Sequence, residues 1–205
     1  MQFETFTPLS QVPFLVHAFT LRTSEDSKAE GFEERLIGTL GFSSDAYASA
    51  AQPHGNSVAV PGKGARLVPH VDALVTREAG LPLVIRCADC AAVFIMDRRT
   101  PAIALIHSGK KGTAGNVVGN VIRRMQMEFA TQAADCFAFI GPSIGPCHYE
   151  MDLWSGIEQQ LRDAGLREIH NPRVCTACHL DRYFSYRAEK GNTGRMFAVL
   201  ALKPQ

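Results

Sequence analysis

The amino-acid sequence predicts an α+β domain in which mixed β-sheets are flanked by helices. Three observations lead to this prediction. Several short apolar runs have the length and bulk of buried strands, two longer segments carry the 3.6-residue apolar period of amphipathic helices, and the two kinds of element do not alternate strictly. Strict alternation would instead indicate a parallel sheet built from βαβ units.

Composition and charge narrow the class of protein. The chain has 205 residues, of which 46% are hydrophobic and 20% charged, so a single domain over residues 1–205 is expected. Its formal net charge of +1 gives no strong attraction to nucleic acid or anionic membranes. No apolar run reaches the ~18 residues that span a bilayer, and the N-terminus lacks the pattern of a signal peptide. We therefore expect a soluble, cytoplasmic protein, and the sequence leaves open whether it is a monomer or a homodimer.

The first third of the chain is predicted to be mostly loops. The polar segment 23–34 is expected to form a surface loop that enters a helix near Phe32–Leu40. Residues 43–64 are rich in Ala, Gly, Ser and Pro, which favours loops with one short strand at Ser57–Val60.

The middle of the chain is predicted to be strands. Residues 72–76 and 82–86 have the pattern of short strands. The apolar runs 91–96 and 102–107 flank a polar turn that ends in Pro101, which favours a buried hairpin over one helix. Two buried strands that are joined differently remain an alternative.

Two amphipathic helices and two more strands are predicted in the second half. After Gly112, apolar residues recur at helical spacing as far as Phe129, and a second helix over Asp152–Ala164 ends at Gly165. A strand over residues 136–140 is followed by a loop at 141–146, and a last strand covers residues 196–202.

The hairpin places a thiol near an imidazole. If the two strands pair in antiparallel fashion, the numbers of opposed residues add to about 197–199, so Cys90 faces His107 or a residue within two of it. Asp89 is adjacent to Cys90, although the strand pleat should direct it elsewhere, and His54 lies in an upstream loop. A Cys–His pair can be a nucleophile with its base. With His54, it can instead hold a zinc ion with one open position. A buried structural pair is the third alternative.

The six cysteines leave further metal sites open. Two CxxC pairs, 87–90 and 175–178, could together form a four-cysteine zinc site, although their separation is long for one. Cys175 and Cys178 with His179 could instead form a second metal site. The CxxCH pattern is also that of c-type haem attachment, which the missing export signal disfavours.

The segment 108–113 is a candidate anion site. It joins the His107 strand to a predicted helix and contains Gly109, Gly112 and two lysines. Backbone N–H groups at a helix N-terminus bind phosphate well when glycines permit a close approach. The spacing of a P-loop is absent, so the segment does not indicate nucleoside triphosphate binding. A solvated basic turn is the alternative.

Nine motifs, in order along nearly the whole chain, match one family. The chain resembles the YfiH-like laccase-domain family, regarded as purine nucleoside phosphorylases. The matching segments are His17–Arg22, Pro53-His54-Gly55, Asp72–Thr76, Ala88-Asp89-Cys90, His107–Gly112, Gly141–Gly145 with Cys147 and Tyr149-Glu150, Cys175–Cys178, Phe184–Arg187 and Thr193–Arg195.

The resemblance implies an activity and a site. It implies a single α+β domain that phosphorolyses adenosine, inosine, guanosine and methylthioadenosine, with adenosine deamination as a second activity. It makes His54, Cys90 and His107 the zinc-binding and catalytic residues. It assigns substrate or phosphate contacts to Arg22 and to Lys111 of the glycine-flanked loop.

The sequence departs from the family pattern in that loop, where the motif HAGWRG is HSGKKG. Lys110 replaces an aromatic residue, and Lys111 replaces an arginine and lacks its bidentate fork. Two loops near the expected pocket are also shorter than in the family. The alternatives are therefore a cysteine hydrolase, with Cys90 as nucleophile and His107 as base, and a catalytically impaired zinc-binding member. Copper oxidase chemistry is disfavoured, because none of the seven histidines forms a His-x-His pair.

Overall fold

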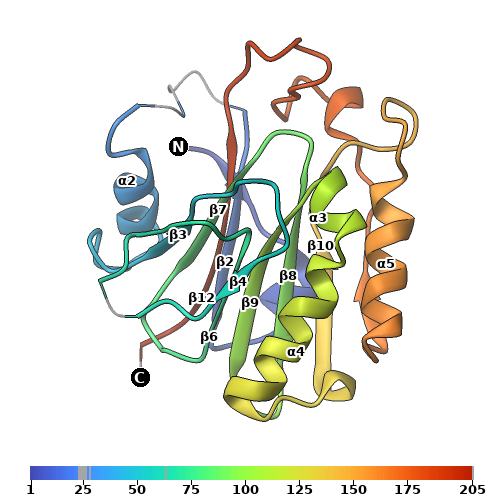
Figure 1. Ribbon diagram of the computed structural model, residues 1–205. Coiled ribbons are helices and arrows are strands. Elements are labelled where there is room, and N and C mark those ends of the chain that lie inside the picture. Colours follow the sequence, from blue (N-terminus) through green and yellow to red (C-terminus); the bar gives the residue numbers. More distant parts are fainter. Residues whose placement is uncertain (23–26, 28, 63, 205) are drawn as a thin grey trace.

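Two six-stranded sheets pack face to face with helices on both outer sides (Figure 1). The computed structural model describes residues 1–22, 27, 29–62 and 64–204. Within them, the arrangement confirms the predicted single α+β domain with mixed sheets flanked by helices. None of the helices in this part of the chain has the length and apolar character that crossing a bilayer requires.

The first sheet is organised around the C-terminal strand. In spatial order its strands are β1 (Phe3–Glu4), β2 (Leu15–Thr20), β12 (Met196–Leu202), β7 (Leu83–Cys87), β3 (Ala48–Ala50) and β5 (Leu67–Val68). Strand β12 runs antiparallel to both β2 and β7, whereas β3 is parallel to β7. The sheet is therefore mixed, as the sequence predicted.

The second sheet contains the predicted hairpin. In spatial order its strands are β11 (Glu168–His170), β10 (Cys136–Ile140), β8 (Ala91–Asp97), β9 (Ala102–Ser108), β6 (Ala73–Thr76) and β4 (Val58–Ala59). Strands β8 and β9 are antiparallel, and the numbers of opposed residues add to 199, from Ala91 opposite Ser108 to Asp97 opposite Ala102. This confirms the predicted hairpin and its register.

Both faces of β8 are buried, which explains its unbroken apolar sequence. Phe94 and Met96 lie in the core between the two sheets, whereas Val93 and Ile95 lie in the core beneath the helices. A strand that is covered on both sides shows no alternation of polar and apolar residues. The same holds for β9 and β12, whose residues are all buried.

Helices form the two outer layers. Helices α4 (Val117–Phe129) and α5 (Leu153–Asp163) cover the second sheet, and α2 (Phe32–Thr39) covers the first sheet on the opposite side (Figure 1). The short helix α1 (Thr7–Ser10) packs against β2.

The helix predicted after Gly112 is in fact two helices. A short helix, α3 (Lys110–Ala114), ends at Gly115, and Asn116 then adopts a left-handed φ of 53°. The Asn116 side chain accepts a hydrogen bond from the Gly119 N–H at 3.1 Å, so it caps the start of α4. The two lysines precede the long amphipathic helix, as predicted, but they form the first turn of the separate helix α3.

Several short or fully buried elements were not predicted, chiefly β2, β3 and β11. His17 lies within β2, where its Nε2 accepts the Phe6 N–H at 2.7 Å. The polar loop predicted over residues 23–34 falls partly on residues 23–26 and 28, which lie outside the described residues.

Candidate active site

Three predicted side chains, those of His54, Cys90 and His107, meet at one end of the second sheet. Cys90 immediately precedes β8, His107 is in β9, and His54 lies in the loop between β3 and β4. Their metal-binding atoms all lie within 4.8 Å of one another. The centroids of the His54 and His107 rings are 4.9 Å apart, and the angle between the ring planes is 86°. The fold thus brings together residues that are far apart in the sequence.

The hairpin register positions the thiol. Because Ala91 is opposite Ser108, Cys90 comes to lie beside Gly109, within the predicted two residues of His107. A Cβ atom on Gly109 would lie only 2.6 Å from the Cys90 Sγ. Gly109 therefore gives the thiol room to reach the imidazoles.

The loop that carries His54 is held in an unusual backbone conformation. Gln52 and His54 have left-handed φ values of 62° and 63°. The Gln52 side chain accepts the Arg86 N–H at 2.8 Å and donates to the Arg86 carbonyl at 2.5 Å, which anchors the loop to β7. A Cβ on Gly112 would lie 2.9 Å from the Gly55 carbonyl oxygen, so this second glycine lets α3 approach the loop closely.

A buried carboxylate, Asp72, joins the loop to the hairpin. Its Oδ1 accepts the His107 Nδ1–H at 2.9 Å and the His54 backbone N–H at 3.0 Å, and its Oδ2 accepts the Gly55 N–H at 2.6 Å. An ionised carboxylate that accepts three N–H groups keeps a proton on His107 Nδ1 and fixes the orientation of the ring, so that Asp72 leaves Nε2 available for another contact.

Asp72 begins one of the segments that match the family, but its position in the sequence alone indicates no role for it. The signal lies in the strand order. Strand β6 pairs with β9 so that Ala73 is opposite Ile106, which places Asp72 beside His107. Finding it requires knowing that these two strands are neighbours.

Hydrogen bonds within the site shift the pKa values of Cys90 and His107 in opposite directions. Burial alone would raise the pKa of the Cys90 thiol, but hydrogen bonds from His107 and His54 lower it to about 6. Burial would lower the pKa of His107, but its bonds to Asp72 and Cys90 raise it to about 9. Without metal, both shifts favour the thiolate and imidazolium forms of the pair.

The three residues are graded in exposure. His107 is buried, Cys90 is half-buried and His54 is exposed, so the site opens to solvent on the His54 side. Asp89 points away from the imidazoles, as expected, and accepts hydrogen bonds from Thr176 Oγ1 and the Arg187 N–H, both at 2.7 Å. Asp72, and not Asp89, is the carboxylate of this site.

A cluster of charged residues lies beside the site. Lys110, next to Gly109, pairs with Glu150 at 3.0 Å, and Arg187 pairs with the same carboxylate at 2.8 Å. The Arg187 guanidinium also lies 4.9 Å from the centroid of the Tyr149 ring, which is a cation–π contact. Arg187, which ends the matching segment Phe184–Arg187, is by this placement a candidate anion contact.

The predicted phosphate-binding residues have different surroundings. Arg22 pairs with Glu189 at 2.8 Å and lies 4.8 Å from the centroid of the Phe184 ring. Lys111 is exposed in α3, and its ammonium group contacts no carboxylate among the described residues. Gly109 and Gly112 have packing roles, as described above. Phosphate contacts by these four residues stay predictions.

The cysteines do not form the four-cysteine site that the two CxxC pairs suggested. Cys90 lies with the histidines, Cys87 is buried in the core between the sheets, and Cys175 and Cys178 gather with Cys147 and His148. His148 therefore takes the place that the sequence gave to His179. A Cys147–His148–Cys175–Cys178 group of this kind can bind a metal ion.

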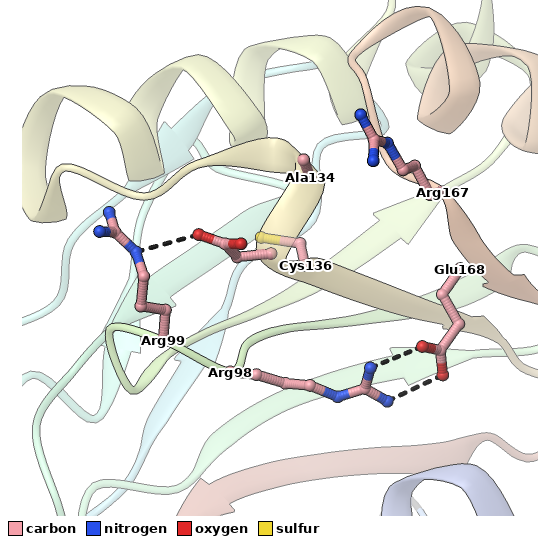
Figure 2. A pocket seen from close by; sticks show the side chains of 7 residues that line it. Arg98, Arg99, Ala134, Cys136, Arg167 and Glu168 are labelled. Atoms are coloured by element: carbon pink, nitrogen blue, oxygen red, sulfur yellow. Dashed lines mark hydrogen bonds and ion pairs between the residues drawn. The ribbon is translucent and has the colours of Figure 1, made fainter.

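A hollow at the opposite end of the hairpin is not part of this site. Figure 2 shows its lining, in which Arg98 forms two bonds to Glu168, at 2.6 and 2.8 Å, and Arg99 pairs with Asp135 at 2.9 Å. The whole of β8 lies between Arg98 and Cys90, a separation of roughly 25 Å. Two of the arginines in this hollow are already neutralised by their ion pairs.

Sequence comparison finds relatives along most of the chain. The family described as multi-copper polyphenol oxidoreductase laccase matches residues 10–152 and 148–203. Purine nucleoside phosphorylase YlmD of Geobacillus stearothermophilus is 28% identical over 83% of this chain and 77% of its own. Proteins named purine nucleoside phosphorylase from Deinococcus radiodurans and Streptomyces coelicolor are 29% and 33% identical, over 95% and 71% of this chain and 93% and 70% of theirs.

Solved structures show the same fold. The crystal structure of YlmD from Geobacillus stearothermophilus superposes with a TM-score of 0.89 at 24% identity, covering 97% of this chain and 94% of that one. The hypothetical protein YfiH of Bacillus licheniformis gives a TM-score of 0.85 at 22% identity, covering 92% and 93%. This chain therefore belongs to the YfiH-like family, whose sequence description is multi-copper polyphenol oxidoreductase laccase.

Proposed function

We propose that this protein is a purine nucleoside phosphorylase whose reaction takes place at His54, Cys90 and His107. The observation that carries the proposal is the convergence of these three side chains, with metal-binding atoms within 4.8 Å of one another at a surface opening. The names of the relatives give the reaction class. Adenosine, inosine, guanosine and methylthioadenosine are the proposed substrates, with phosphate as the second substrate.

The donor set of the site fits zinc. Two imidazoles and one thiolate are ligands that zinc prefers, and three protein ligands leave the open position of a catalytic site. The Asp72–His107 hydrogen bond is the outer contact that metal-binding histidines usually make. When bound, zinc would supply a Lewis acid beside the substrate. The absence of His-x-His pairs in the sequence favours zinc over a multicopper centre.

The chain's own residues would prepare the two substrates. Asp72 accepts the His107 Nδ1–H and so orients the imidazole ring. Hydrogen bonds from the His54 and His107 imidazoles lower the pKa of the Cys90 thiol to about 6 and so favour its ionised form near neutral pH. In phosphorolysis the purine departs with the bonding electron pair, positive charge develops on the ribose, and phosphate attacks it. Cations that hold the phosphate, and a group that relieves the negative charge on the purine, therefore lower the barrier. Lys111 and Arg22 are the proposed phosphate contacts. Lys110 follows Gly109, and the Arg187 backbone N–H donates to Asp89, so these two cations also lie near Cys90 and are further candidates for binding phosphate.

Adenosine deamination is the proposed second activity at the same three residues. It replaces the exocyclic amine with oxygen from water and needs no phosphate. The two reactions are therefore separated by their products and by their dependence on phosphate.

The test is product analysis with purified protein and adenosine, with and without phosphate. We expect adenine only when phosphate is present. If the protein also deaminates, inosine should form without phosphate, and inosine together with hypoxanthine should form with phosphate. Cys90→Ala should abolish both products. Cys136→Ser is the matched control, because Cys136 is a buried cysteine outside both clusters, bonded to the Gln132 carbonyl. If Cys90→Ala retains wild-type activity, or if the wild type forms neither product, the proposal is wrong.

One observation favours a second candidate function, that of a cysteine hydrolase. Cys90, His107 and Asp72 form a thiolate, imidazolium and carboxylate series, with the pKa of the thiol lowered to about 6. This is the order of groups in an activated cysteine nucleophile. The two candidates differ in their need for metal. Hydrolysis that persists in chelator-treated protein and is lost on iodoacetamide alkylation of Cys90 would establish the hydrolase.

A further inference from the structure

A second cluster of metal-binding side chains lies away from the active-site residues. Cys147 and His148 come from the loop between β10 and α5. Cys175 precedes a single turn of 3₁₀ helix at Thr176–Cys178, and Cys178 is the last residue of that turn. The ligand atoms of the four residues all lie within 4.8 Å of one another. None of the reaction steps above uses these residues, so their convergence needs its own explanation.

Four of the distances between ligand atoms in this cluster are close to those of a tetrahedral zinc site. Zinc–sulfur and zinc–nitrogen bonds of about 2.3 and 2.0–2.1 Å place two sulfurs about 3.8 Å apart and a sulfur and a nitrogen about 3.5 Å apart. Here the Sγ atoms of Cys147 and Cys178 are 3.6 Å apart. His148 Nδ1 lies 3.3, 3.5 and 3.8 Å from the Sγ atoms of Cys147, Cys178 and Cys175. These distances therefore agree with a metal at the centre.

The backbone supports thiolates at this place. The Gly145 N–H donates to the Cys175 Sγ at 3.3 Å, and the Cys178 N–H bonds to the Cys175 carbonyl at 3.2 Å, which closes the turn between the two cysteines. Outer hydrogen bonds of this kind orient the ligands of a metal site. A set of three thiolates and one imidazole is a donor set that selects zinc.

We propose that Cys147, His148, Cys175 and Cys178 form a closed structural zinc site. All four tetrahedral positions are supplied by the protein, whereas His54, Cys90 and His107 supply only three. Zinc binds here by displacing the protons of the thiols. Cys147, His148 and Cys178 are exposed, so the ion reaches the site from solvent.

The zinc would fix the positions of two segments that contact Asp89, the residue before Cys90. The Cys175 turn is bridged to Ser143, and the next residue, Thr176, donates to the Asp89 carboxylate at 2.7 Å. The Ile144 N–H donates to the Asp89 carbonyl at 2.8 Å. Asp89 directly precedes Cys90 and has a left-handed φ of 87°. The cluster therefore crosslinks the two segments that keep Asp89, and with it the start of β8, in place.

Metal content measures this site without any assay of turnover. Purified chain would be analysed for zinc by mass spectrometry beside three variants. Cys178→Ser changes an exposed ligand of the cluster, Cys90→Ser changes the active site, and Cys136→Ser is the control. We expect Cys178→Ser to lose one zinc per chain relative to wild type, Cys136→Ser to lose none, and the loss to be additive when Cys178→Ser and Cys90→Ser are combined.

Cobalt and thiol measurements identify the ligands. On the Cys90→Ser background, Co²⁺ should give the thiolate charge-transfer and visible bands of a tetrahedral site, and these should disappear with Cys178→Ser. Chelation should lower the melting temperature of the Cys90→Ser protein by at least about 5 °C. The proposal is overturned if Cys178→Ser retains the zinc content of wild type, or if peptide mapping of fresh protein finds a Cys147–Cys178 disulfide. On the Cys90→Ser background, the cluster of Cys147, His148, Cys175 and Cys178 is the metal site that is measured. A negative result there would therefore refute the structural zinc site without bearing on the proposed phosphorylase activity.

Discussion

Replacing Asp72 with asparagine tests the carboxylate that organises the site. Asp72 is buried, and it accepts the His107 Nδ1–H and the backbone N–H groups of His54 and Gly55 at 2.6–3.0 Å. Asparagine keeps the shape but replaces one carboxylate oxygen with an NH₂ group. That NH₂ meets an N–H donor, so at least one buried donor loses its acceptor.

Two magnitudes follow from this geometry. A buried donor without a partner costs about 1–3 kcal/mol of stability, with charge-assisted bonds at the upper end. The loss of a carboxylate that orients a metal-binding histidine costs about 10–100-fold in metal affinity or activity. We therefore expect Asp72→Asn to fold, with lower stability, and to lose at least about tenfold in phosphorolysis.

Asp97→Asn is the matched control for this measurement. Asp97 is also fully buried, and its Oδ1 accepts the N–H groups of Arg99 and Thr100 at 2.9 and 3.0 Å, but it lies at the far end of the same hairpin. Urea denaturation would measure stability, and adenosine phosphorolysis and zinc affinity would measure the site. If Asp72→Asn and Asp97→Asn lose activity equally, or if Asp72→Asn loses less than about twofold, the assigned positioning role is wrong.

Three further predictions concern individual residues. Gly109→Ala should fold but lose most activity, because the new Cβ would press on the Cys90 Sγ, whereas Gly38→Ala, with no atom within 4 Å, should leave kinetics unchanged. Glu150→Gln should lower the KM for phosphate about two- to fivefold by freeing its two cations, and an unchanged or higher KM would count against a phosphate site there. Burial lowers the pKa of His17 from 6.5 to about 4, so its contribution to stability is present above pH 6.5 and is lost as pH falls towards 4. Acidification from pH 7 to 4 should therefore destabilise wild type by about 2–3 kcal/mol more than His17→Gln, as measured by urea denaturation, and equal losses would refute this.

Much of the second sheet could be predicted because its information is local. The hairpin follows from two apolar runs around a polar turn, and its register follows from the position of the turn, which is enough to place Cys90 near His107. The helix stripe on α4 is likewise a repeat within one segment. The break at Gly115 and Asn116 was missed because a left-handed residue interrupts the helix without ending the apolar period.

The first sheet was harder to predict for a physical reason. Strands β2 and β12 are neighbours although they lie at opposite ends of the chain, and pairing over that separation leaves no local signal. His17 interrupts an otherwise apolar segment, but within the fold its Nε2 accepts the Phe6 N–H and the ring stays neutral. A buried polar residue with a partner looks like a strand breaker until the partner is known.

The sequence by itself determined the α+β class, the hairpin and the candidate residues His54, Cys90 and His107. Only the tertiary structure decided which groups complete them. It brings Asp72 into hydrogen-bonding contact with His107. It also places His148, and not His179 as the sequence suggested, in a cluster with three cysteines, Cys147, Cys175 and Cys178. Hydrogen bonds and metal ligation act over about 2–4 Å in space, and a linear sequence fixes such distances only within one turn or hairpin.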